Sequence, residues 1–186
     1  NKRLESKGHK TKRPASKTKM KLIFEDDDDD NNNENMSLND IINNDTLKKA
    51  VDNLFKSLLP SEYDIKELHE YTQILPGKYY EPGSHLLNRQ VAFALKHTDE
   101  RLFLSWVLLR SKASDFDYDS IQGLYNQWNK MGRKQNGITK RSIVYWAKQD
   151  AFDEYKKVKH TTIDYFIKET LFSRTEFDKA LVLHKM

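Results

Sequence analysis

The chain has 186 residues, of which 32 are Lys or Arg, 28 are Asp or Glu and none is Cys, and its net charge is +4. The lack of cysteine excludes disulfide frameworks, cysteine-ligated zinc sites and thiol nucleophiles, and it is typical of a reducing, intracellular compartment. No apolar run reaches the roughly 18–20 residues that cross a bilayer, and no signal peptide opens the chain, so we expect no membrane partner.

Residues 1–45 are expected to form a disordered charged linker. Residues 1–24 carry nine Lys or Arg and one acid, whereas residues 25–46 carry nine acids and no Lys or Arg. Runs such as Asp26–Asp30 offer too little apolar surface to offset the entropy of ordering them. The basic stretch at 10–21 also allows a nuclear-import signal or a phosphate-binding arm, but charge blocks of this kind favour a solvated linker.

Apolar residues at helical spacing predict an all-α domain over 46–172, a compact bundle of about seven helices, and no alternating strand competes. Cap residues mark several helix starts, namely Asp45-Thr46, Asp99, Asp117 and Thr139. The predicted helices cover residues 45–59, 61–75, 85–97, 99–109, 117–131, 139–148 and 161–172, with a short turn that contains Phe152 and Tyr155.

All the tryptophans fall on the apolar faces of three successive predicted helices. Trp106, Trp128 and Trp146 each recur with other apolar residues at a spacing of three or four. We therefore expect them to belong to the structural core rather than to a binding surface.

Three features resemble catalytic or ligand-binding motifs, and we interpret each as structural. Gly132 and Gly137 have P-loop spacing, but Ile138 stands where the motif needs lysine, and no buried strand precedes them. The alternating carboxylates of 115–119 resemble a two-metal site but lie between helices, where capping is their ordinary role. The histidines show no metal-ligand spacing, and no nucleophile signature is present. No catalytic residue, metal or cofactor is therefore expected in this chain.

Basic residues around the sixth predicted helix favour recognition of nucleic acid. A basic turn followed by a basic helix start resembles a helix-turn-helix in outline, although the turn of about seven residues exceeds the usual 3–4. The alternative is an ordinary helical hairpin with soluble turns. A second patch near residue 78 combines charge with aromatic rings. The candidate nucleic-acid contacts are Arg133, Lys134, Lys140, Arg141, Lys148, Lys78 and Tyr79.

The order of these residues resembles the C-terminal helical domain of type 2 primases, found in primase–helicase fusion proteins of large nucleocytoplasmic DNA viruses, phages and related mobile elements. The match covers roughly residues 47–158 and departs at Asn88, where the pattern predicts tryptophan. The matching residues are Tyr79-Tyr80, Val91–Leu95, Leu104-Ser-Trp106, Arg110–Lys112, Tyr118, Trp128, Gly137–Thr139, Ser142-Ile143 and Tyr145–Ala147.

The resemblance implies a parent protein in which this chain follows an archaeo-eukaryotic-type primase domain and precedes a superfamily 3 helicase. The chain opens on Asn1 rather than Met, and residues 173–186 stop inside an amphipathic pattern, so we expect a fragment whose end begins the helicase-side segment. The parent would use ATP and Mg²⁺, whereas neither active site would lie in this chain. Its site of action would be a virus factory in the host cytoplasm, or the nucleus.

Two functions follow from these expectations. The first is a non-catalytic module of a DNA replication primase–helicase that links the two enzymes and contacts template DNA. Its partners would be DNA, the adjacent primase and helicase domains, and other copies joined in a homo-oligomer through the helicase. The alternative is a protein–protein scaffold for helicase ring assembly or replisome docking, without DNA contact.

Overall fold

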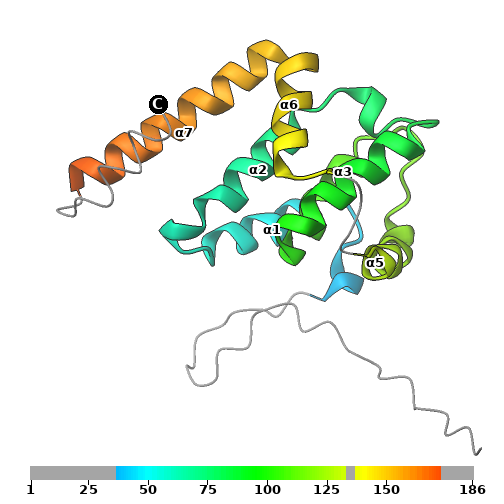
Figure 1. Cartoon of the computed structure of the whole chain (residues 1–186). Coiled ribbons are helices and arrows are strands. Elements are labelled where there is room, and N and C mark those ends of the chain that lie inside the picture. Colours follow the sequence, from blue (N-terminus) through cyan, green and yellow to red (C-terminus); the bar gives the residue numbers. More distant parts are fainter. Residues whose placement is uncertain (1–36, 133–136, 173–186) are drawn as a thin grey trace, which may run out of the picture. The chain divides into compact units, whose positions relative to one another are not determined.

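The computed structural model describes residues 37–132 and 137–172, with the backbone alone for 169–172. Within these ranges the chain forms helices and no strand, which confirms the predicted all-α class (Figure 1). The α-helices are α1 (Asn44–Lys56), α2 (Tyr63–Gln73), α3 (His85–Thr98), α4 (Phe103–Arg110), α5 (Ile121–Lys130), α6 (Lys140–Asp150) and α7 (Phe152–Phe172). Short 3₁₀ helices connect them: η1 (Leu38–Asp40), η2 (Pro60–Glu62), η3 (Gly77–Tyr79), η4 (Glu100–Leu102) and η5 (Tyr118–Ser120).

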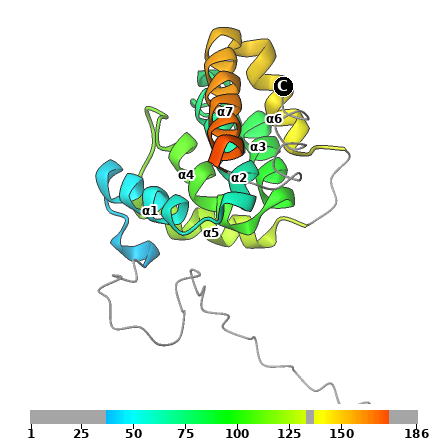
Figure 2. The same ribbon diagram turned by 90° about the vertical axis from the view of Figure 1, so that its left-hand side faces the viewer.

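Helix α4 lies at the centre of the packing. It contacts α1, α2, α3 and α5, and Figure 2 shows it between α1 and α2. Its sequence, FLSWVLLR, is apolar apart from Ser105 and Arg110, which is the pattern of a helix that is covered on most sides. Only Leu108 and Arg110 of its eight residues are more than slightly exposed, so the other helices are arranged around it.

Aromatic side chains from α4 and α5 form the largest ring cluster of the core. Trp106 and Trp128 are 2% and 0% exposed, and their rings stack with centroids 5.8 Å apart. Phe103 packs edge-on against both tryptophans and against Tyr125. Offset and edge-to-face arrangements of this kind contribute about 0.5–1.5 kcal/mol per pair beyond the apolar area they bury.

Helix α1 begins one residue earlier than expected, because Asn43 caps it. The Asn43 Oδ1 atom accepts hydrogen bonds from the backbone N–H groups of Asp45 and Thr46, and the Thr46 Oγ1 atom accepts one from the Asn43 N–H. The packed chain also starts before residue 46, since Leu38 and Ile41 are buried. These two residues belonged to the expected charged linker at 1–45; residues 1–36 of that linker and the segment 173–186 lie outside the described residues.

Helix α7 is one continuous helix, so the expected division into a short turn and a helix at 161–172 is wrong. Its packed face carries Tyr155, Val158, Thr162 and Phe166, at the spacing i, i+3, i+7 and i+11. Thr162 is only 2% exposed, and its polarity hid the continuity of this stripe. Through Tyr165 and Phe166 the helix packs on Tyr63 of α2. None of the helices in the described ranges combines the length and the apolar character of a bilayer-spanning helix.

Replacing Gly123 with alanine should raise the free energy of unfolding by about 1 kcal/mol, because glycine in a helix interior is that much less favourable than alanine. Gly123 is exposed within α5, and a Cβ atom there would meet nothing within 4 Å. Gly137 is the matched control: its φ of +76° is a left-handed conformation, so alanine there should destabilise the protein by roughly 1–2 kcal/mol. Urea unfolding of both variants tests these opposite signs.

Candidate nucleic-acid interface

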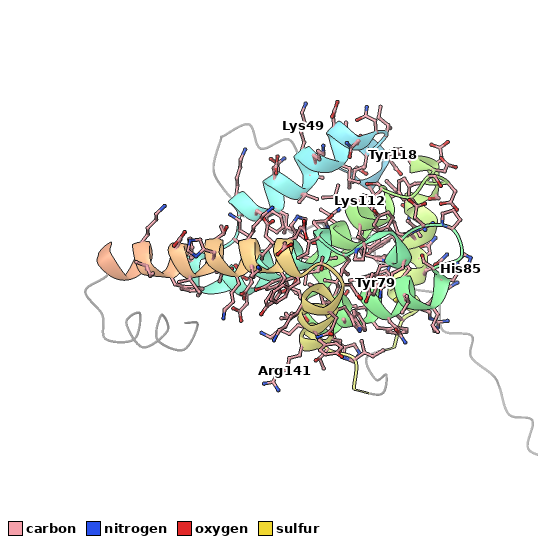
Figure 3. All side chains as sticks on the ribbon, turned by 90° about the horizontal axis from the view of Figure 1, so that it is seen from above. Lys49, Tyr79, His85, Lys112, Tyr118 and Arg141 are labelled. Carbon is pink, nitrogen blue, oxygen red and sulfur yellow. The ribbon has the colours of Figure 1, made fainter. Side chains whose placement is uncertain are left out.

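Helix α6 turns one face to the core and the opposite face to solvent. Ile143 and Ala147 are fully buried where the helix packs on α2 and α3. Arg141, Tyr145 and Lys148 follow one another at the spacing i, i+4 and i+7 on the other side, and all three are exposed. We call these three residues the outward face of α6. Figure 3 shows Arg141 pointing away from the packed helices.

The outward face of α6 carries two positive charges, from Arg141 and Lys148. Within the described part of the chain, Arg141 and Lys148 make no ion pair. Asp150 is the one acid in α6, and it pairs elsewhere. The two cations are therefore available to an anionic ligand.

Lys140 is less available than its neighbour Arg141. Its Nζ atom lies 3.1 Å from the Oδ2 atom of Asp64 on α2, with about half of each side chain exposed. Exposed pairs of this kind contribute only about 0–1 kcal/mol, but the contact holds the lysine against α2 rather than toward solvent. Of the basic residues expected at the start of the sixth helix, Arg141 thus has the freer charge.

The predicted patch of charge and aromatic rings near residue 78 has a different role in the structure. Tyr79 is 2% exposed, so its ring cannot offer a stacking face to a base, and this expectation is corrected. Its hydroxyl donates a 2.6 Å hydrogen bond to the Oδ2 atom of Asp150, while the Lys78 Nζ atom lies 2.7 Å from Oδ1 of the same carboxylate. Figure 3 shows Tyr79 among the packed helices.

Asp150 thus joins the η3 turn to the last turn of α6. The hydrogen bonds from Lys78 and Tyr79 hold the pKa of Asp150 below its usual value. Burial, together with the hydrogen bond to Asp150, raises the pKa of the Tyr79 hydroxyl. The Tyr79 ring packs against Trp146 with centroids 5.7 Å apart, so this contact fixes the inner side of α6. Trp146 is half-buried, whereas Trp106 and Trp128 are enclosed in the core.

The connection between α5 and α6 is longer than expected. Helix α5 ends at Lys130 and α6 begins at Lys140. The connection therefore exceeds the 3–4 residues of a helix-turn-helix, and α6 packs mainly on α2, α3 and α7. Arg133 and Lys134, the candidate contacts of this turn, lie outside the described residues.

A buried polar cluster between α2 and α4 was not found from the sequence. The His69 Nδ1 atom lies 2.9 Å from the Ser105 hydroxyl, and the Gln73 side-chain amide donates to the Ser105 carbonyl. Burial lowers the pKa of His69 to about 3, with smaller contributions from Lys112 and Lys66. No local signal reveals this cluster, because His69 and Ser105 are 36 residues apart. Because His69 is only 6% exposed, its ring packs inside the fold between α2 and α4 and does not face solvent.

The described ranges offer no assembled metal site. No group of three or more His, Cys, Asp or Glu side chains in them is placed to hold an ion. Asp117, one of the alternating carboxylates, accepts a hydrogen bond from the Asp119 N–H and caps η5, as predicted. The outward face of α6 presents two cations and an exposed tyrosine ring, which can make ionic and stacking contacts with a ligand.

Comparison with known proteins shows a similarity to viral proteins named as primases. Three proteins of African swine fever virus, each named "Putative primase", match it with 29% identity over 111 residues. They come from a Namibian warthog isolate, the Badajoz strain and a Malawian tick isolate. The match covers 58% of this chain and 11% of each viral protein, so the chain spans only a small part of these relatives. No family model matches the chain, and no solved structure matches it significantly.

Proposed function

We propose that this chain is a non-catalytic helical module of a DNA replication primase–helicase, which links the primase and helicase domains and contacts template DNA through the outward face of α6. The observation that carries the DNA contact is the free charge of Arg141 and Lys148 beside an exposed aromatic ring. Similarity to a viral primase over 111 residues supports the replication context. In this proposal, ATP and Mg²⁺ are used by the flanking enzymes of the parent protein.

The placement of Arg141 supports a role in binding rather than in helix stability. Lys140 and Arg141 occupy the first turn of α6, which contains no acid. Cations at a helix N-terminus oppose the helix macrodipole and cost about 0.3–1 kcal/mol each. A binding role accounts for cations at this unfavourable position, because a helix N-terminus that carries two cations attracts a phosphate.

Reversing both free charges tests the proposal. In the double variant Arg141→Glu/Lys148→Glu, we expect weaker DNA binding by the full chain and a log K versus log salt slope that is shallower by about 1.4–1.8, because each lost phosphate contact removes about 0.7–0.9. Fluorescence anisotropy at several salt concentrations measures both quantities. A glutamate at position 141 agrees with the helix dipole, whereas a glutamate at position 148, in the last turn of α6, opposes it. Thermal unfolding of the double variant therefore checks that it is folded before binding is compared.

The matched control is Lys48→Glu/Lys49→Glu on α1, which makes the same change in net charge at two exposed lysines. Figure 3 shows Lys49 and Arg141 at opposite edges of the molecule in that view. The basic N-terminal residues are common to all variants, so differences between variants report on the helical domain. If the α6 and α1 variants lose affinity and slope equally, the attraction is a general effect of charge and the interface is not α6. If both variants bind DNA as well as the wild type does, the result favours the alternative function, a protein–protein scaffold without DNA contact.

A further inference from the structure

We infer that Tyr145 is a base-stacking residue, and that the outward face of α6 therefore binds single-stranded DNA in preference to duplex. This inference rests on the proposed function, because it assigns the form of DNA to the same surface. It starts from the exposure of Tyr145, which leaves 60% of a large aromatic side chain in solvent.

The exposed ring of Tyr145 differs from the other exposed ring of this kind, that of Phe152, in having no partner among the described residues. Only two Phe, Tyr or Trp side chains in the described ranges are more than half exposed, Tyr145 and Phe152. The Phe152 ring is already occupied, since the Lys156 Nζ atom lies 4.7 Å from its centroid and the Tyr155 ring stacks on it. No ring, cation or hydrogen-bond partner of Tyr145 is found among the described residues.

The cations beside Tyr145 are also unpaired, whereas the cation beside Phe152 is paired. Arg141 precedes Tyr145 by four residues and Lys148 follows it by three, so a cation neighbours the tyrosine on each side along the helix surface. Neither cation is paired within the described ranges, whereas Lys156 beside Phe152 is 3.0 Å from Asp153. A nucleotide whose base lies on the Tyr145 ring has a backbone phosphate on either side of it, and the two cations can take those phosphates.

Stacking on an exposed ring selects for single strands. A base in a duplex is already stacked on its neighbours, and freeing it costs a few kcal/mol, whereas a base in a single strand is available. Proteins that bind single strands combine aromatic platforms with a basic track in this manner. Electrostatic contact with Arg141 and Lys148 serves both forms of DNA, so the tyrosine is the element that discriminates between them.

The test compares Tyr145→Ala, Tyr145→Phe and Phe152→Ala in the full chain, with poly(dT) as the single strand and a poly(dA)·poly(dT) duplex as the second probe. Tyr145→Ala should weaken binding to poly(dT) by roughly 5- to 150-fold, the range for loss of one stacked base, and leave duplex affinity unchanged. Tyr145→Phe keeps the ring and should bind both probes as the wild type does. Phe152→Ala, the matched control with an occupied ring, should not change poly(dT) binding. Thermal unfolding of each variant provides the check on folding, and little change is expected at Tyr145 because 60% of it is exposed.

A fluorescent variant gives a direct readout. In Tyr145→Trp, poly(dT) should quench more fluorescence than in the wild type, because Trp106 and Trp128 are buried and the half-buried Trp146 is common to both proteins. The inference is overturned if Tyr145→Ala affects both probes equally or neither, or if saturating poly(dT) quenches Tyr145→Trp no more than the wild type. If the double reversal at Arg141 and Lys148 still weakens binding in that case, the proposed DNA contact stands without stacking. If the reversal has no effect either, the proposed function fails as well.

Discussion

Replacing Asn88 with leucine is expected to lower the free energy of unfolding by about 2–5 kcal/mol, because it leaves two buried polar groups without partners. Asn88 is buried in α3, where its Nδ2 atom donates a 2.8 Å hydrogen bond to the Tyr79 carbonyl. Its Oδ1 atom accepts a 3.1 Å hydrogen bond from the Trp106 indole. Leucine has a similar volume but can neither donate nor accept, so both bonds are lost without an equivalent gain. Chemical unfolding of the full chain measures the difference.

The control replaces a leucine of the same helix with asparagine, which is the opposite substitution at an exposed position. Leu86 is 71% exposed, so Leu86→Asn should alter the free energy of unfolding by no more than about 0.5 kcal/mol. The Asn88 variant should also loosen the η3 turn, because the Tyr79 carbonyl loses its donor. A loss of stability no larger for Asn88→Leu than for Leu86→Asn would show that these buried hydrogen bonds are not a major source of stability.

The same contacts explain the departure of the sequence from the pattern it resembles. The pattern predicts tryptophan at position 88, but this site needs both a donor for the Tyr79 carbonyl and an acceptor for the Trp106 indole. The asparagine amide supplies both, whereas an indole supplies only a donor. The choice of residue could not be predicted locally, because Trp106 lies 18 residues further along the chain.

Local sequence predicted several helix starts only in part. Asp99, Asp117 and Thr139 stand at N-caps, and the first two accept hydrogen bonds from backbone N–H groups two residues on. Asp99 and Asp117 cap the 3₁₀ helices η4 and η5, however, and the α-helices that follow begin only at Phe103 and Ile121. Such caps depend on neighbours within a few residues, so a sequence reveals them. The continuity of α7 was missed because its buried face includes the polar Thr162, whose burial depends on tertiary packing.

In the candidate site, too, local sequence predicts some features, and contacts between distant residues determine the others. The exposure of Arg141, Tyr145 and Lys148 follows from their place opposite Ile143 and Ala147 on one helix, which periodicity predicts. The burial of Tyr79 depends on Asp150, which lies 71 residues away, and the pairing of Lys140 depends on Asp64, 76 residues away. Spacing along the chain therefore predicts which face a side chain occupies, whereas its partner across the fold decides whether its charge or ring is free.

Lowering the pH from 7 to 5 should reduce the free energy of unfolding by about 2 kcal/mol through His69 alone. Burial against Phe55 and Ser105 lowers the pKa of His69 to about 3, while the unfolded chain has the ordinary value of 6.5. Between these values the unfolded state binds the proton and the folded state does not. The stabilisation is therefore complete above pH 6.5 and is lost progressively as the pH falls toward 3. Unfolding curves in denaturant at both pH values measure it.

His69→Gln separates this effect from other titrations. Glutamine can keep a hydrogen bond to Ser105 but does not bind a further proton between pH 5 and pH 7. The quantity to compare is the difference in unfolding free energy between pH 7 and pH 5, not stability at one pH, since the substitution also alters packing. The pH range avoids most carboxylate titration, including that of Glu62, Asp99 and Asp150, whose pKa values are lowered by their hydrogen bonds. The wild type should lose about 2 kcal/mol more than the variant. Equal losses in the two proteins would mean that His69 is not held neutral by burial, and that the Ser105 contact survives protonation.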